Sequence, residues 1–190
     1  WTKPDGKRII FGSDREKRWF IFWKAADGTG KVEQVASVPD TGIWPYSISN
    51  DGKTLFFEQW SSSGGPNIGM LAMEGDRTPK LLLQEEYAES QPQISPSGRW
   101  LAYSSNESGQ NNVFIRPLPD VDSGRWQVST SGGAYPLWSP DERELFYRSG
   151  DSYMAVEVET EPAFKLGKTA VLFKGTYTSG SGLVGMELTH

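Results

Sequence analysis

The sequence lacks residue types on which several kinds of catalytic and metal site depend. It contains no cysteine and a single histidine, His190, which is its last residue. Without cysteine, a disulfide framework and a thiolate metal site are excluded. One histidine is too few for a three-histidine zinc site and leaves almost no material for a Ser-His-Asp triad. We therefore expect no metal, no cofactor and no enzymatic activity.

Two further features limit the kinds of partner. No apolar run approaches the roughly 20 residues of a membrane-spanning helix. The formal net charge is −5, which argues against a surface built to bind nucleic acid or an anionic membrane. We expect no nucleic-acid binding and no membrane insertion by this segment.

Turn-forming and aromatic residues are abundant. The chain has 8 Trp, 7 Tyr and 9 Phe, together with 21 Gly and 12 Pro among 190 residues. This mixture is typical of many short strands joined by tight turns. No stretch shows the apolar periodicity of an amphipathic helix.

One turn-and-strand unit recurs along the chain. Pro96–Gly98 forms the turn, because proline presets φ and glycine tolerates a positive φ. Trp100–Ser105 follows with the alternation of a strand. The same unit begins at about 45-residue intervals, at Pro4–Lys7, Asn50–Lys53 and Pro140–Arg143. Several strands per repeat at this spacing predict an all-β fold, a β-propeller built from four four-stranded repeats.

Each repeat is expected to supply strands A to D, from the propeller axis outward. The expected strands cover residues 8–13, 19–24, 32–38, 46–49, 54–59, 67–73, 80–84, 93–95, 100–105, 112–118, 126–130, 136–139, 144–148, 153–159 and 169–173. In the first repeat, strand A is missing or reduced to Trp1–Lys3. We expect residues 1–190 to be one domain, with repeats at about 1–44, 45–91, 92–135 and 136–175 and a tail at 176–190.

An open arc of four repeats would leave two apolar sheet faces exposed to water. Three arrangements would cover them. The tail could supply the inner strand of the first blade, a second copy could complete the ring, or the chain could be part of a longer propeller. The sequence leaves these three alternatives open.

The repeats resemble the TolB-like, WD-type β-propeller repeats of bacteria, through Pro4–Gly6, Ser95–Gly98 and Ser139–Asp141. A closer resemblance is to propellers that lie C-terminal to bacterial serine/threonine kinase domains. It is carried by Gly98–Gly109, Gly124–Thr130 and Glu144–Gly150. The resemblance implies a sensing or protein-interaction module of about six blades, in an extracytoplasmic or periplasmic location.

The acidic turn residues have a local structural interpretation. Asp5, Asp51 and Asp141 can each accept a nearby backbone N–H in an Asx-turn. Asp120–Gly124 has the alternating oxygen ligands of a calcium loop, but the twelfth position is Ser131 where such a loop needs glutamate. We therefore expect a hairpin turn there and no metal site.

The best candidate binding surface is formed by the segments that enter each strand A. Its predicted contact residues are Trp44, Tyr46, Gln91 and Tyr135. Rigid aromatic side chains on a loop-lined face suit a protein or peptide partner. Alternatively, Trp44 and Tyr135 pack between neighbouring blades.

Two other functions remain alternatives. A small ligand or cation could bind in the central channel, lined by residues such as Ser47 and Gln93. The domain could also be the accessory propeller of a hydrolase whose catalytic domain lies outside this chain.

Overall fold

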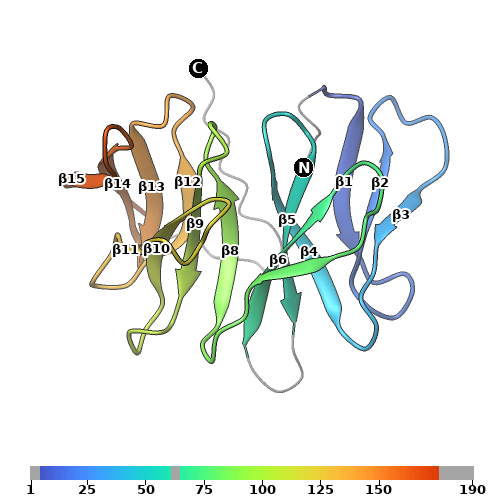
Figure 1. Ribbon diagram of the computed structural model, residues 1–190, viewed down its shortest axis with the longest axis horizontal. Coiled ribbons are helices and arrows are strands. Elements are labelled where there is room, and N and C mark those ends of the chain that lie inside the picture. The colour runs from blue at the N-terminus through green and yellow to red at the C-terminus, as the bar shows by residue number, and fades with distance from the viewer. Residues whose placement is uncertain (1–4, 61–64, 176–190) are drawn as a thin grey trace.

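The computed structural model describes residues 5–60 and 65–175, and every regular element in these ranges is a β-strand (Figure 1). Residues 1–3, the tail and His190 lie outside the described residues. Closure of the ring by the tail therefore falls outside the described part of the chain as well.

The strands form four separate antiparallel sheets, each with its strands in chain order. The first sheet contains β1 (Arg8–Ser13), β2 (Phe20–Ala25) and β3 (Glu33–Ala36). The second contains β4 (Gly42–Ile48), β5 (Thr54–Trp60), β6 (Pro66–Ala72) and β7 (Lys80–Leu83). The third contains β8 (Glu89–Ile94), β9 (Trp100–Ser105), β10 (Asn112–Pro117) and β11 (Trp126–Gln127). The fourth contains β12 (Ala134–Trp138), β13 (Glu144–Ser149), β14 (Ser152–Glu159) and β15 (Lys165–Lys174).

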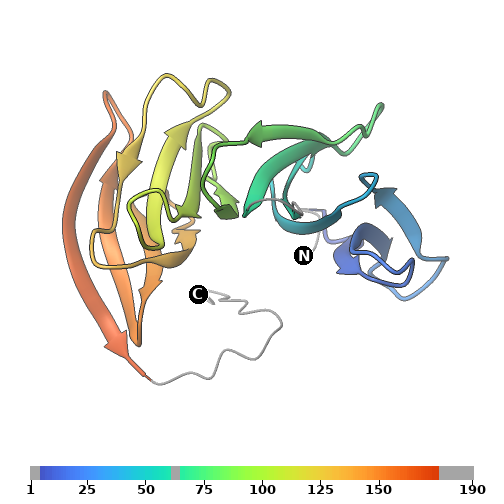
Figure 2. The ribbon, with the colours of Figure 1, turned by 90° about the horizontal axis from the view of Figure 1, so that it is seen from below.

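Figure 2 shows the sheets following one another along an arc, with an open side between the first and the fourth. The predicted all-β, partial propeller is confirmed, with a first sheet of three strands among the described residues.

The segments that were predicted to be loops leading into the inner strands are mostly part of those strands. Gly42 pairs with Trp60 and Glu89 pairs with Ser105, so β4 and β8 begin several residues before their predicted starts. The prolines at 45, 92 and 136 are tolerated because the ladders of β4, β8 and β12 each shift register there. The prediction of an entry loop was wrong because these bulges admit proline inside a strand.

The recurring turns are stabilised as the sequence predicts. The Oδ1 atoms of Asp5, Asp51 and Asp141 accept backbone N–H groups two residues on, at 2.9, 3.0 and 3.2 Å. The hydroxyls of Ser49 and Ser139 also donate to Asp51 and Asp141. These serine hydrogen bonds, followed by those from the backbone, lower the pKa of Asp51 and Asp141. The three aspartates therefore stabilise the turns in which they lie.

Three apolar cores lie between successive sheets. Successive residues of a strand point to opposite faces, so Phe57 enters the core with the first sheet and Phe56 the core with the third. In the same way, Leu101 enters the core with the second sheet and Ala102 enters the core with the fourth sheet. The second and third sheets are therefore apolar on both faces, as stacked blades require.

The outer end of the fourth sheet is less covered. Val171, Leu172 and Phe173 of β15 are about half-exposed, although they are large and apolar. They are consecutive on the longest strand, at an edge of the sheet. An exposed apolar edge of this kind is a site where further protein surface packs.

The first two sheets meet through a close aromatic contact. A Cβ on Gly12 of β1 would lie 2.5 Å from Cε3 of Trp44. We expect Gly12→Ala to lower the free energy of unfolding by about 1–3 kcal/mol, because the indole cannot stay in place. Gly42→Ala is the matched control, since its Cβ would approach Trp19 only to an ordinary 3.4 Å. Equal urea midpoints for the two variants would contradict this packing.

Candidate binding site on the inner strands

Three of the four predicted contact residues, on the inner strands β4, β8 and β12, belong to one polar network with residues of β5 and β9. Gln91 of β8 is its centre: its backbone N–H donates to Oε1 of Glu58 at 2.7 Å. Its side-chain Oε1 accepts the backbone N–H of Tyr135 at 2.7 Å and the hydroxyl of Ser104 at 2.8 Å. Tyr46 joins through a hydrogen bond with the Glu58 carboxyl. We call Tyr46, Glu58, Gln91, Ser104 and Tyr135 the inner-strand cluster; it ties the second, third and fourth sheets together.

Glu58 gives the cluster its electrostatic character. Glu58 is buried, with only 2% of its surface exposed to solvent. Burial raises the pKa of the Glu58 carboxyl to about 7, while hydrogen bonds from Gln91 and Tyr46 oppose part of the rise. Burial and then the Glu58 charge raise the pKa of the Tyr46 hydroxyl. The site therefore gains or loses a proton near neutral pH.

The backbone at two cluster residues is strained. Gln91 and Tyr135 have φ values of 57° and 56°, in the left-handed region that non-glycine residues rarely adopt. Each precedes a proline, and each donates its backbone N–H to another cluster residue. Strain of this kind gathers at functional sites, where surrounding contacts hold it. Here it presents Tyr135, which is 39% exposed, on the inner strand of the fourth sheet.

Trp44 lies elsewhere. Its ring meets that of Trp19 edge-on, with centroids 4.5 Å apart, and covers Gly12. This contact agrees with the alternative in which Trp44 packs between neighbouring blades, because its ring fills the junction of the first and second sheets. Tyr135, by contrast, keeps an exposed ring.

Ser47 and Gln93 connect sheets. The buried Ser47 hydroxyl donates to the carbonyl of Pro92 at 2.9 Å and accepts the N–H of Ile94 at 3.3 Å. The carbonyl of Gln93 accepts Nε1–H of Trp138 at 3.2 Å. The Ser47 hydroxyl is therefore used between β4 and β8, and ligand binding in the channel stays a prediction.

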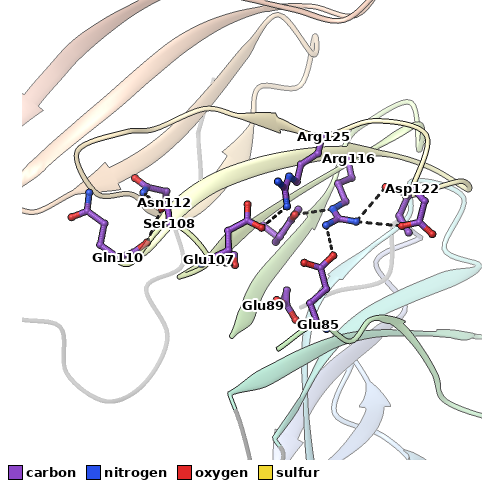
Figure 3. Close-up of polar contacts among 12 residues, drawn as sticks. Glu85, Glu89, Glu107, Ser108, Gln110, Asn112, Arg116, Asp122 and Arg125 are labelled. Carbon is purple, nitrogen blue, oxygen red and sulfur yellow. Dashed lines mark hydrogen bonds and ion pairs between the residues drawn. The ribbon is translucent and has the colours of Figure 1, made fainter. Parts of the chain in front are cut away.

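A second polar cluster, between the second and third sheets, surrounds Arg116 (Figure 3). The Arg116 side chain is 7% exposed, and its Nε donates to the Tyr103 hydroxyl at 2.9 Å. Its other nitrogens form an ion pair with Glu85, approach Asp122 at 3.5 Å and donate to the carbonyl of Val121. Arg116 therefore joins the chain leaving β7 to the third sheet.

Glu89 lies beside this pair, at the start of β8 (Figure 3). It is buried, and its Oε2 accepts the backbone N–H of Glu85 at 3.4 Å. Its Oε1 has no hydrogen-bond partner among the described residues. Burial, followed by the nearby charge of Glu85, raises the pKa of Glu89 to about 7, and the Arg116 charge opposes the rise.

The predicted hairpin turn at Asp120–Gly124 has its acids engaged by protein groups. Oδ1 of Asp120 accepts the N–H of Asp122 at 3.3 Å, and Asp122 faces Arg116. In residues 5–60 and 65–175, no group of acids or histidines has the arrangement of a metal site.

Neither Glu58 nor Glu89 was among the four predicted contact residues. Glu58 lies within the largely apolar β5, whereas Glu89 is the first residue of the mostly polar β8. Their burial comes from the packing of neighbouring sheets, so their raised pKa values could not be predicted from the chain alone.

Comparison with known proteins places the fold. No protein-family model matches the chain, and no curated protein matches it in sequence. Among solved structures, a putative TolB from Agrobacterium tumefaciens superposes with a TM-score of 0.74 at 18% identity, over 90% of this chain and 63% of that one. TolB from Acinetobacter baumannii gives 0.73 at 21%, over 93% and 43%. A chain from a study of two prolyl endopeptidases gives 0.57 at 13%, over 90% and 28%.

These likenesses define the class. The chain has the fold of a TolB-like β-propeller and spans less than two thirds of the length of either TolB structure. The described residues contain no helix that could cross a membrane.

Proposed function

We propose that this domain is a non-catalytic propeller scaffold that binds a protein or peptide through the inner-strand cluster. The observation that carries the proposal is the convergence of Tyr46, Gln91 and Tyr135, from three sheets, on one hydrogen-bonded network. A rigid tyrosine that is already ordered loses little conformational entropy when a partner covers it. The strained backbone at Gln91 and Tyr135 supports the same interpretation.

The domain would act as the sensing or docking part of a larger bacterial protein. Its resemblance to kinase-associated propellers and its coverage of only part of each TolB chain support this setting. The half-exposed Val171, Leu172 and Phe173 would then be covered by further blades or by a second copy that completes the ring.

One observation favours the hydrolase alternative: the fold is similar to that of a chain from a structural study of two prolyl endopeptidases. In that case the propeller would be an accessory to a catalytic domain elsewhere in the protein. Its lower TM-score makes this the second candidate.

A peptide library displayed on phage and selected against the domain tests the binding proposal. We expect Tyr135→Asn to weaken the selected peptides by about tenfold, because an aromatic anchor is lost while asparagine tolerates the positive φ. Tyr87→Asn is the matched control, since Tyr87 is 38% exposed and lies outside the cluster. Unchanged affinity in Tyr135→Asn, or an equal loss in both variants, would refute the site assignment.

A further inference from the structure

A groove lies between the outer strand of the first sheet and a turn of the second sheet, away from the inner-strand cluster. Its volume is about 520 Å³. One wall is residues 34–39, which comprise most of β3 and the chain that leaves it, and the other wall is the turn at residues 76–79 before β7. Figure 1 shows β3 at the outer end of its sheet.

The first wall is a strand edge without a neighbour. β3 pairs with β2 on one side and is the terminal strand of its sheet. Within residues 5–60 and 65–175, no strand pairs with its other edge. Such an edge presents backbone N–H and C=O groups in the pattern that an added extended peptide requires.

The second wall carries one acid and one base, Asp76 and Arg77. Oδ1 of Asp76 already accepts the backbone N–H and the hydroxyl of Thr78, whereas the guanidinium of Arg77 is held in a fixed place without an acid among the described residues. Arg77 lies over the Trp23 ring, with the guanidinium carbon 4.3 Å from the ring centroid. Its Nε donates to the carbonyl of Met73 at 3.2 Å. Arg8 also lies over the Trp23 ring, 3.7 Å from the centroid. Neither arginine has an ion-pair partner in the described parts of the chain.

We propose that this groove binds an extended acidic peptide segment, which adds to the free edge of β3 and places a carboxylate on Arg77. The backbone of β3 supplies sequence-independent hydrogen bonds, and Arg77 selects for the acid. The hydrogen bond to Met73 holds the guanidinium in position, so little side-chain freedom remains to be lost. Val38 and Pro79 also line the groove and suit apolar side chains on either side of the acid.

The test uses the full chain and a short, labelled peptide of alternating threonine and valine with one central glutamate. Fluorescence polarisation is compared with the same peptide carrying glutamine in place of glutamate. We expect the glutamate peptide to bind about tenfold more tightly, and Arg77→Gln to abolish that preference, because a charge-assisted hydrogen bond is lost. Arg143→Gln removes the same charge from an exposed turn on the fourth sheet and serves as the control.

Hydrogen exchange locates the peptide. Binding should slow amide exchange in residues 33–38, and Arg77→Gln should lessen that effect for the glutamate peptide. Equal affinity for the two peptides would overturn the proposal, as would protection at β8 and β12, which would place the peptide on the inner-strand cluster. Slow exchange at β3 without peptide, accompanied by a dimeric mass, would overturn it in favour of a second copy.

Discussion

Arg116→Ala is expected to lower the free energy of unfolding by about 2–4 kcal/mol, because the buried Tyr103 hydroxyl loses its donor and the buried side chain leaves a space. The guanidinium is nearly inaccessible and serves the Tyr103 hydroxyl, the Glu85 carboxylate and the Val121 carbonyl. Its removal leaves the Tyr103 hydroxyl without its donor and opens a space between the second and third sheets. Urea unfolding followed by tryptophan fluorescence measures the loss.

Arg18→Ala is the matched control for this prediction. Arg18 also forms an ion pair, with Asp40, but both side chains are exposed, by 47% and 96%. An exposed pair contributes about 0–1 kcal/mol, so this variant should unfold near the wild-type midpoint. Similar losses in the two variants would show that Arg116 does not hold the sheets together.

Glu58→Gln should make the domain more stable in alkaline solution and leave it nearly unchanged in acid. The pKa of Glu58 is raised from 4.5 to about 7 in the folded state. Between these values the folded chain holds a proton that the unfolded chain has released, so stability falls as pH rises toward 7. Above pH 7 the full cost, about 3 kcal/mol, is present in the wild type. Glutamine keeps a hydrogen-bond acceptor for Gln91 and carries no charge.

The measurement is the difference in unfolding free energy between variant and wild type at pH 5 and at pH 8. Taking this difference cancels the titration of Glu89, whose pKa is also raised. Glu16→Gln, in an exposed loop of the first sheet, is the control and should show no such change. A difference that stays constant with pH would mean that Glu58 is ionised throughout.

The turns and the second strand of each repeat were predictable because their chemistry is local. Aspartate and glycine in turns such as Asp5–Gly6 act within a few residues, and β1 and β9 have their predicted bounds. The starts of β4 and β8 were missed because proline inside a strand is favourable only where a bulge removes the ladder bond. That bulge depends on the partner strand.

The candidate site was partly predictable for a related reason. Tyr46, Gln91 and Tyr135 occupy the same region of successive repeats, so the repeat itself brings them to one axis. Glu58 could not be found this way, since its role comes from the neighbouring sheet that buries it. Trp44 has the same sequence character as Tyr135, but its ring packs against Trp19 and covers Gly12, a contact that comes from the neighbouring sheet.

The proposed function requires that a partner binds at the inner-strand cluster. Hydrogen exchange of the wild-type domain, with and without a library-selected peptide, is the direct test. The predicted result is slower exchange in β8 and β12, centred on Gln91 and Tyr135. Protection confined to the outer strands, with β8 and β12 unchanged, would contradict it.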